Sequence, residues 1–153
     1  MRKSSKIYRS QRGDLVIELG IGAFLFLVFS LTSFDLGLLV FCADLNDRAC
    51  RDAARAAAQG SDITSATKLA KAALLAHSPI VAYMSPPAIQ GTINYVDFGG
   101  HPPNSQTAPY VQVTTSTVSQ IPTGPVQFLG AKFLPGGHAT FVQTYTFPII
   151  KTK

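Results

Sequence analysis

The first sixty residues carry one continuous helical pattern in two parts. The first part, residues 15–41, is a long apolar run. A helix over this run would be about 40 Å long, which exceeds the hydrocarbon core of a bilayer at about 30 Å. Its central segment, residues 19–34, is uncharged, and its hydroxyls at Ser30, Thr32 and Ser33 can bond back to helix carbonyls. The pattern predicts a transmembrane helix.

The second part, residues 43–59, is rich in alanine and charge. Opposite charges recur four residues apart, in Asp44–Arg48, Asp47–Arg51 and Arg48–Asp52. One face carries only small side chains, at Ala49, Ala53, Ala56 and Ala57. That face is typical either of a solvated helix stabilised by alanine propensity or of close packing against another helix. Gly60 is a natural stop, so one helix is predicted over about residues 15–59.

A second, shorter helix is predicted over residues 63–77. Ser61 or Asp62 can cap its first turn, and Pro79 ends it. Its apolar positions recur at helical spacing and comprise Ala66, Leu69, Ala70, Ala73 and Leu74.

The remainder of the chain has strand patterns separated by glycine and proline pairs. Residues 89–98, 110–119 and 138–150 are rich in β-branched and aromatic residues. Residues 127–134 fit either a short helical turn or a crossing segment. The predicted class is α+β: a long N-terminal transmembrane helix continuing outside the membrane, a second short helix, and a small antiparallel β-sheet packed against the distal half of the long helix.

Charge is distributed unevenly along the chain. Thirteen basic and eight acidic residues give a net charge of +5. Five of the basic residues and none of the acidic ones lie in residues 1–13, so the body is neutral. The body therefore offers no basic surface for nucleic acid. A basic head before an apolar run predicts a cytoplasmic N-terminus, with residues 43–153 on the other side of the membrane.

This distribution divides the chain into three predicted regions. They are a basic leader at residues 1–13, a transmembrane and extended helix at residues 14–60, and an extracytoplasmic α+β domain at residues 61–153. The apolar run is longer than the apolar region of a secretory signal peptide. The bulky Phe41 before Cys42 also argues against cleavage as a lipoprotein or at a signal-peptide site.

Cys42 and Cys50 are the only cysteines. Eight positions on one helix separate their Cα atoms by roughly 12 Å, which is too far for a mutual disulfide. They are expected either to be small buried residues or to form a disulfide between subunits. No cysteine zinc site or disulfide scaffold is expected.

Catalytic and metal-binding patterns are missing from the sequence. Common nucleophile, phosphate-loop and zinc-protease motifs do not occur. His77, His101 and His138 are scattered, without a partner at ligand spacing. Asp97 could bind a cation, but a role in a turn is the preferred interpretation. No catalytic residue, metal or cofactor is predicted, so the chain is not expected to be an enzyme.

Two carboxylates stand at the edges of the uncharged segment. Glu18 either needs a charged partner or lies at the level of the cytoplasmic headgroups. Asp35 lies about 30 Å along the helix from Leu15, so it falls at the outer interface unless the helix sits deeper. In the deeper position it needs a partner subunit or a bonded backbone group.

The N-terminal third resembles the TadE-like pseudopilins of tight-adherence pilus systems. The matching text is Arg12-Gly13-Asp14-Leu15-Val16-Ile17-Glu18, the apolar run, Asp35-Leu36-Gly37 and the alanine–arginine segment at residues 53–60. The resemblance implies cleavage by a prepilin peptidase after Gly13, with Asp14 as the new N-terminus. Glu18 would then pair with the α-amine of Asp14 during assembly, and Asp35 and Gly37 would form a polar pair in the membrane or at an interface.

The resemblance also implies a function and partners. The chain is expected to be a structural minor pseudopilin or pilus-assembly component in a bacterial inner membrane. Its partners would be membrane lipid, the peptidase, other pilin or pseudopilin subunits and the inner-membrane assembly platform. The alternative is an uncleaved single-pass protein whose extracytoplasmic domain binds a ligand or mediates adhesion. An anchored enzyme is a third, less favoured interpretation.

Overall fold

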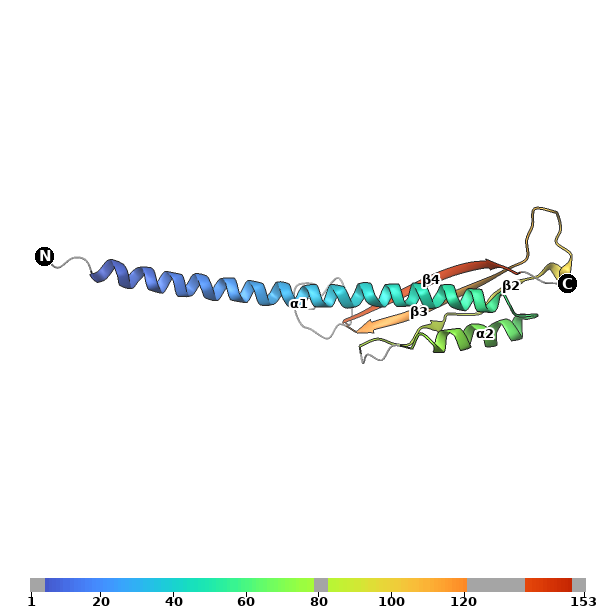
Figure 1. The fold of residues 1–153 in the computed structure, drawn as a ribbon, viewed down its shortest axis with the longest axis horizontal. Helices are drawn as coiled ribbons and strands as arrows, with labels where there is room; N and C mark the ends of the chain where they lie inside the picture. The colour runs from blue at the N-terminus through green and yellow to red at the C-terminus, as the bar shows by residue number, and fades with distance from the viewer. Residues whose placement is uncertain (1–4, 79–82, 121–136, 150–153) are drawn as a thin grey trace.

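The computed structural model describes residues 5–78, 83–120 and 137–149. The dominant element is α1 (Ser5–Ala57), a single helix of 53 residues. Its N-terminal half extends alone, and its C-terminal half lies against a small domain (Figure 1). The predicted class is confirmed: a long apolar helix, a second helix and a small antiparallel sheet. The helix begins at Ser5 rather than near Leu15, so Gly13 lies inside an unbroken helix.

The second helix, α2 (Ile63–Leu75), follows a tight turn. Asp62 is its cap, and the carboxylate accepts the backbone N–H of Ser65 at 2.7 Å. Gly60 in the turn is buried, and a Cβ there would lie 2.5 Å from the backbone nitrogen of Ala66. Only glycine therefore permits this close approach between the end of α1 and the start of α2.

The sheet is built around β3 (Tyr110–Gln120). On one side β3 pairs over its whole length with β4 (His138–Pro148). On the other side it pairs with two short strands, β1 (Ala88–Ile89) and β2 (Asn94–Val96). All pairs are antiparallel. A one-turn helix, η1 (Phe98–Gly100), follows β2.

The predicted strand at residues 89–98 is wrong as a single element. Gly91, with φ of +76°, lies in the break between β1 and β2. A left-handed residue cannot continue an extended strand, so the segment divides there. The uncertain segment at residues 127–134 lies outside the described residues.

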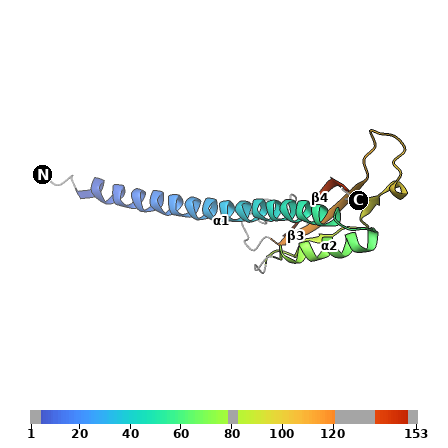
Figure 2. The ribbon, with the colours of Figure 1, turned by 45° about the vertical axis from the view of Figure 1, so that its right-hand side comes forward.

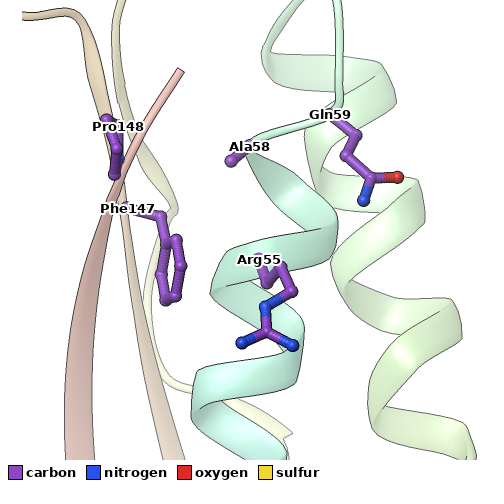
Figure 3. Close-up of a pocket in the computed structure, with 5 residues that line it drawn as sticks. All are labelled: Arg55, Ala58, Gln59, Phe147 and Pro148. Carbon is purple, nitrogen blue, oxygen red and sulfur yellow. The ribbon is translucent and has the colours of Figure 1, made fainter. Parts of the chain in front are cut away.

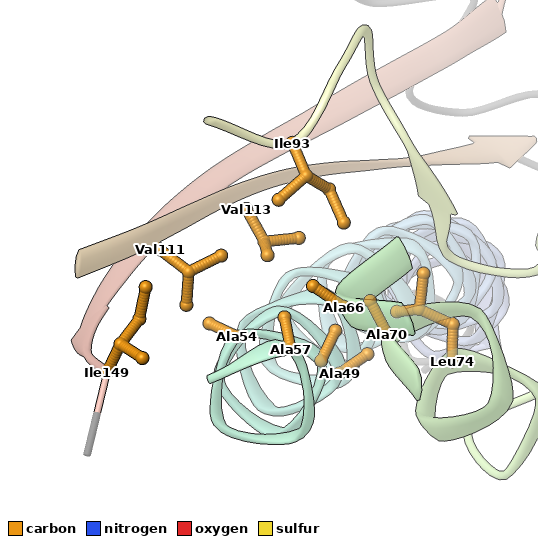
Figure 4. Packing of buried hydrophobic residues seen from close by; sticks show 11 residues of the cluster. Ala49, Ala54, Ala57, Ala66, Ala70, Leu74, Ile93, Val111, Val113 and Ile149 are labelled. Atoms are coloured by element: carbon orange, nitrogen blue, oxygen red, sulfur yellow. The ribbon is translucent and has the colours of Figure 1, made fainter. Parts of the chain in front are cut away.

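Both helices pack on one face of the sheet, with α1 and α2 side by side (Figures 1 and 2). Their shared core is made largely of alanine (Figure 4) and consists of Ala49, Ala53, Ala54, Ala57, Ala66, Ala70, Leu74, Ile93, Val111, Val113 and Ile149. Small side chains let α1 approach α2 and the sheet closely. Of the two interpretations of the alanine face, the structure bears out close packing. Ala56 is only partly buried.

A row of polar and cysteine side chains joins α1 to the sheet beside this apolar core, toward the N-terminal end of α1. We call it the polar seam: Cys42, Asn46 and Cys50 from α1, with Thr115, Thr117 and Ser119 from β3. All six residues are fully buried. Four residues of helix rise about 6 Å and two residues of strand about 6.7 Å, so the two rows stay nearly level over this length.

Asn46 is the centre of the polar seam. Its Oδ1 accepts hydrogen bonds from the hydroxyls of Thr115 at 3.0 Å and Thr117 at 3.1 Å. Its Nδ2 donates to the carbonyl of Phe141 in β4 at 3.1 Å. One side chain therefore ties the helix to two strands, which fixes both the rotation of α1 and its register along the sheet.

The charged residues of α1 from Asp44 to Arg55 are exposed or half-buried. Two of the three predicted ion pairs form, each at 2.8 Å: Arg48–Asp44 and Arg51–Asp47. For the third, Asp52 lies 3.0 Å from Nε2 of His77 at the end of α2 instead of pairing with Arg48. Such exposed pairs contribute at most about 1 kcal/mol each, so the core and the polar seam dominate stability.

Replacing Asn46 by leucine is expected to lower the free energy of unfolding by about 2–3 kcal/mol, because buried hydroxyls and a carbonyl lose their partner. Adding Thr115→Val and Thr117→Val to Asn46→Leu should recover part of that loss, since the unpaired hydroxyls are then gone. Denaturant unfolding of the full chain in detergent, followed by circular dichroism, measures this. Asp44→Ala is the control, and it should change stability by less than about 1 kcal/mol. An Asn46→Leu variant as stable as the Asp44→Ala variant would contradict the role given to the seam.

Candidate functional site

The exposed half of α1 is the first candidate site. Residues 13–30 are exposed apart from the half-buried Val28, and Leu19 and Phe26 are 72% and 74% exposed. This stretch is about 27 Å long, close to the hydrocarbon thickness of a bilayer. Within the described residues, one helix, α1, is long enough and apolar enough to span a membrane. An exposed apolar surface of this size needs lipid or other helices around it.

Contacts with the rest of the chain begin before the predicted apolar run ends. Leu31 and Thr32 are half-buried, and Asp35 is fully buried. Thr32 donates to the carbonyl of Val28 at 2.8 Å, as predicted for hydroxyls in this helix. The stretch exposed on all sides, residues 13–30, is therefore shorter than the predicted apolar run at residues 15–41. Its length is closer to the thickness of the hydrocarbon core than the length of that run is.

Asp35 and Gly37 are not brought together. Asp35 is 0% exposed, whereas Gly37 is exposed, with nothing within 4 Å of a Cβ built on it. Two residues apart on a helix, they point about 200° from each other. Asp35 is already buried within its own chain, so its burial needs no second subunit. Gly37 leaves an open position on the exposed side of α1.

Asp14 and Glu18 share one face at the N-terminal end of the exposed stretch. Together with Ile17 and Ile21 they line a shallow recess of about 300 Å³. Both carboxylates are exposed and lie one helical turn apart. Like charges at this spacing destabilise a helix by a few tenths of a kcal/mol. The pair costs more in lipid, where neither charge is solvated.

Gly13 immediately precedes this pair. A Cβ built on Gly13 meets nothing within 4 Å, so no contact with the described residues requires glycine there. Glycine inside a helix costs about 1 kcal/mol relative to alanine. The fold therefore gives no reason for this residue, in contrast to Gly60. A small side chain at Gly13 would meet no described neighbour, so it is not expected to disturb the domain.

The two cysteines are buried and form no disulfide with each other. Cys50 lies 3.4 Å from the carbonyl oxygen of Val113 and 3.3 Å from that of Gln143, within reach of its weak S–H donor. Burial raises the pKa of the Cys50 thiol, which keeps it protonated and unreactive. Cys42 is also fully buried. The interpretation as small buried residues is supported, because a disulfide between subunits would require α1 to leave the sheet.

The histidines and Asp97 do not assemble a metal site. No group of three or more His, Cys, Asp or Glu side chains occurs in the part of the chain that the structure describes. His77 contacts only one carboxylate in that part, at Asp52. His101 and His138 are exposed. Asp97 immediately precedes η1, in the turn position that the sequence favoured.

Sequence analysis missed the polar partners of α1. Asn46 lies midway between Cys42 and Cys50, and this spacing places all three on one face, which was the available signal. Tyr145 could not be foreseen. Its hydroxyl donates to Asp47 at 2.9 Å and accepts from Arg51 at 3.0 Å. The hydrogen bond to Tyr145 and the charge of Asp47 raise the pKa of Arg51, so its guanidinium remains cationic.

Comparison of this chain with models of known protein families, with curated protein sequences and with solved structures gives no match.

Cys42 and Cys50 should be protected in the folded chain. In detergent, maleimide labelling of both thiols is expected to be slower by at least about tenfold than in denaturant, because modification requires the helix to open from the sheet. Mass spectrometry of labelled peptides measures each site. A cysteine introduced at exposed Asp44 in a chain lacking the other two is the matched control and should label fast. Rapid labelling of Cys50, or a Cys42–Cys50 disulfide, would contradict the packing of α1 on β3.

Proposed function

We propose that this chain is a structural minor pseudopilin or assembly component of a tight-adherence pilus or related secretion system, processed by a prepilin peptidase after Gly13. One observation carries the proposal: a single helix joins an exposed apolar stretch to a packed domain. We call the exposed stretch, residues 13–30, the rod, and we call the C-terminal half of α1 together with α2 and the sheet the head. Side-by-side packing of such rods would cover their apolar surfaces and would set the positions of the attached heads relative to one another. The motif Gly13-Asp14 with Glu18 stands at the free end of the rod.

Cleavage would change the charge balance at that end. In the intact chain, Asp14 and Glu18 place two negative charges one turn apart. Cutting the Gly13–Asp14 bond adds an α-amine with a reference pKa of about 7.7–8.0, hence one positive charge near neutral pH. Burying that charge alone in a helix bundle costs several kcal/mol, and a carboxylate beside it offsets much of the cost. Glu18 of a neighbouring subunit can supply this carboxylate, and Glu18 of the same chain is the competing geometry.

Charge supports one orientation of the rod. All five basic residues of the leader precede the exposed stretch, so the leader belongs on the cytoplasmic side of the inner membrane and the head outside. The partners in this arrangement are membrane lipid, the peptidase, other pilin or pseudopilin subunits and the inner-membrane assembly platform. The head contributes packing surface, and no catalytic step is assigned to it.

Gly13→Leu is expected to leave residues 1–13 attached, because the peptidase requires a small residue before the bond that it cuts. The wild-type protein should lack these residues. Intact-mass measurement on protein purified from membranes of cells that contain the peptidase reads both results. Gly13→Ala is the matched control for loss of glycine from the helix and should remain largely cleaved. A wild-type protein of full mass under these conditions would instead favour an uncleaved, membrane-anchored binding or adhesion protein.

Glu18→Gln is expected to insert into the membrane and to be largely cleaved, but to assemble at least about tenfold less, because the buried amine of Asp14 loses its partner. Glu18→Asp keeps the charge and should assemble better than Glu18→Gln. Sheared-pilus yield per unit of cleaved membrane protein measures assembly. Wild-type yield from Glu18→Gln would leave Glu18 as a carboxylate at the headgroup level, and the pairing mechanism would fail.

A further inference from the structure

In the part of the chain that the structure describes, the outer edge of β4 is long and open. β4 pairs with β3 along eleven residue pairs. Among the described residues, no strand pairs with its other side. The opposite edge of the sheet is different, because β1 and β2 cover β3 in short pieces separated by Gly91.

The hydrogen bonds of β3 show which groups of β4 point outward. The carbonyls of Thr114 and Val118 accept from Gln90 and Ser85, each at 2.8 Å, so even-numbered residues of β3 face the β1 side. N–H and C=O groups of one strand residue point the same way and alternate along the strand. Odd-numbered residues of β3 therefore face β4, and the register matches odd with odd. The backbone groups pointing outward from β4 belong to His138, Thr140, Val142, Thr144 and Thr146.

This edge lacks the usual protection against pairing. Edge strands in soluble domains are commonly short or carry charged residues, proline or a bulge. Residues 139–147 contain neither a charge nor a proline, and the strand is about 36 Å long. The side chains of Thr140, Val142 and Thr144 are exposed, so the outer face beside the edge is also accessible.

A cationic pocket lies beside the C-terminal end of β4 (Figure 3). It has a volume of about 330 Å³ and is lined by Arg55, Ala58, Gln59, Phe147 and Pro148. The guanidinium of Arg55 lies 5.8 Å from the ring centroid of Phe147. Arg48 and Arg51 have carboxylate partners, whereas Arg55 forms no ion pair within the described part of the chain. The pocket therefore suits an acidic side chain with an apolar stem.

The direction of β4 decides which strand fits its edge. Phe141 contacts Asn46, and Phe147 contacts Arg55, so β4 and α1 run in the same direction. Two copies anchored in one membrane would hold their β4 strands parallel. If a twofold axis parallel to the strands related the two copies, identical residues would lie at the same level, and the outward backbone groups of both copies would belong to the same residues. Hydrogen bonding between parallel strands requires the facing residues to be offset by one position, so these groups would not pair. Antiparallel pairing of two β4 strands would point the α1 helices in opposite directions. A second copy's β4 therefore does not complete the edge.

We propose that the outer edge of β4 receives an extended strand from a different protein. This strand runs antiparallel to β4, toward the free end of α1, and places an acidic side chain from its N-terminal part in the pocket at Arg55. Backbone hydrogen bonds to Thr140, Val142, Thr144 and Thr146 supply most of the recognition. The inference requires α1 to be a membrane anchor but does not depend on cleavage at Gly13.

The test uses the full chain in detergent micelles and a synthetic peptide of alternating threonine and valine with glutamate at its second position. Fluorescence anisotropy of the labelled peptide should show saturable binding. The same peptide with alternate amides N-methylated should not bind. Thr144→Pro removes an outward N–H without removing a backbone hydrogen bond to β3, and should weaken binding at least about tenfold. Like the Thr144→Val control, it also loses the hydroxyl that lies 2.9 Å from the hydroxyl of Thr114. Thr144→Val, which keeps that N–H, is the matched control. Arg55→Gln should weaken binding of the glutamate peptide and not of its glutamine counterpart.

Several results would overturn the proposal. One is the absence of saturable binding to the wild-type chain. Another is equal binding of the N-methylated peptide, a comparison that uses the wild-type chain and so holds even if Thr144→Pro is unstable. Unchanged affinity of a folded Thr144→Pro chain would also overturn it. A dimer of the wild-type chain alone that Thr144→Pro abolishes would assign the edge to a second copy and refute a different protein as the occupant.

Discussion

The contact of Asn46 with β3 and β4 is the interaction on which the arrangement of the molecule depends. A long helix with an alanine face could slide or rotate on a sheet at little cost, because small apolar contacts are similar in many registers. The buried amide of Asn46 restricts that freedom, since the observed register supplies it with two hydroxyl donors and a carbonyl acceptor. A misplaced register would leave buried polar groups unpaired, at a cost of about 1–3 kcal/mol for each group.

Fixing α1 on the sheet also fixes the relation between rod and head. The helix that provides the alanines of the core continues without a break into the exposed apolar stretch. No hinge residue of the kind that proline supplies interrupts α1 between them. The direction of the rod therefore determines where the head lies, and packing among rods would transmit directly to the surfaces of the heads.

Polar groups along α1 differ in how their charge is accommodated. In the distal half, Asp44 and Asp47 have arginine partners one turn away. Asp35 is buried within the chain. Asp14 and Glu18, by contrast, stand exposed on an apolar helix and repel each other. Among the described residues, no cationic side chain pairs with Asp14 or Glu18.

Much of the fold could be predicted from local patterns in the sequence. The apolar run, the i,i+4 charges and the cap at Asp62 predicted both helices, and β-branched runs predicted β3 and β4, because these signals depend on near neighbours in the chain. The pattern of residues 89–98 misled, since one left-handed glycine overrides β propensity on either side. Predictions for Gly13, Asp14 and Glu18 also came from sequence, and the monomer fold adds only their exposure and open surroundings.

The tertiary structure decided everything that joins distant segments. Asn46 and Thr115 are 69 residues apart, and Arg51 and Tyr145 are 94 apart, so no local pattern links them. It also showed that the alanine face of α1 packs within the chain and that both cysteines are buried against the sheet. Burial and edge exposure depend on which strand lies next to which. The sequence by itself determined the rod, its charges and the types of element, because those follow from composition and period. Only the folded chain determined which faces are covered and which edge stays open.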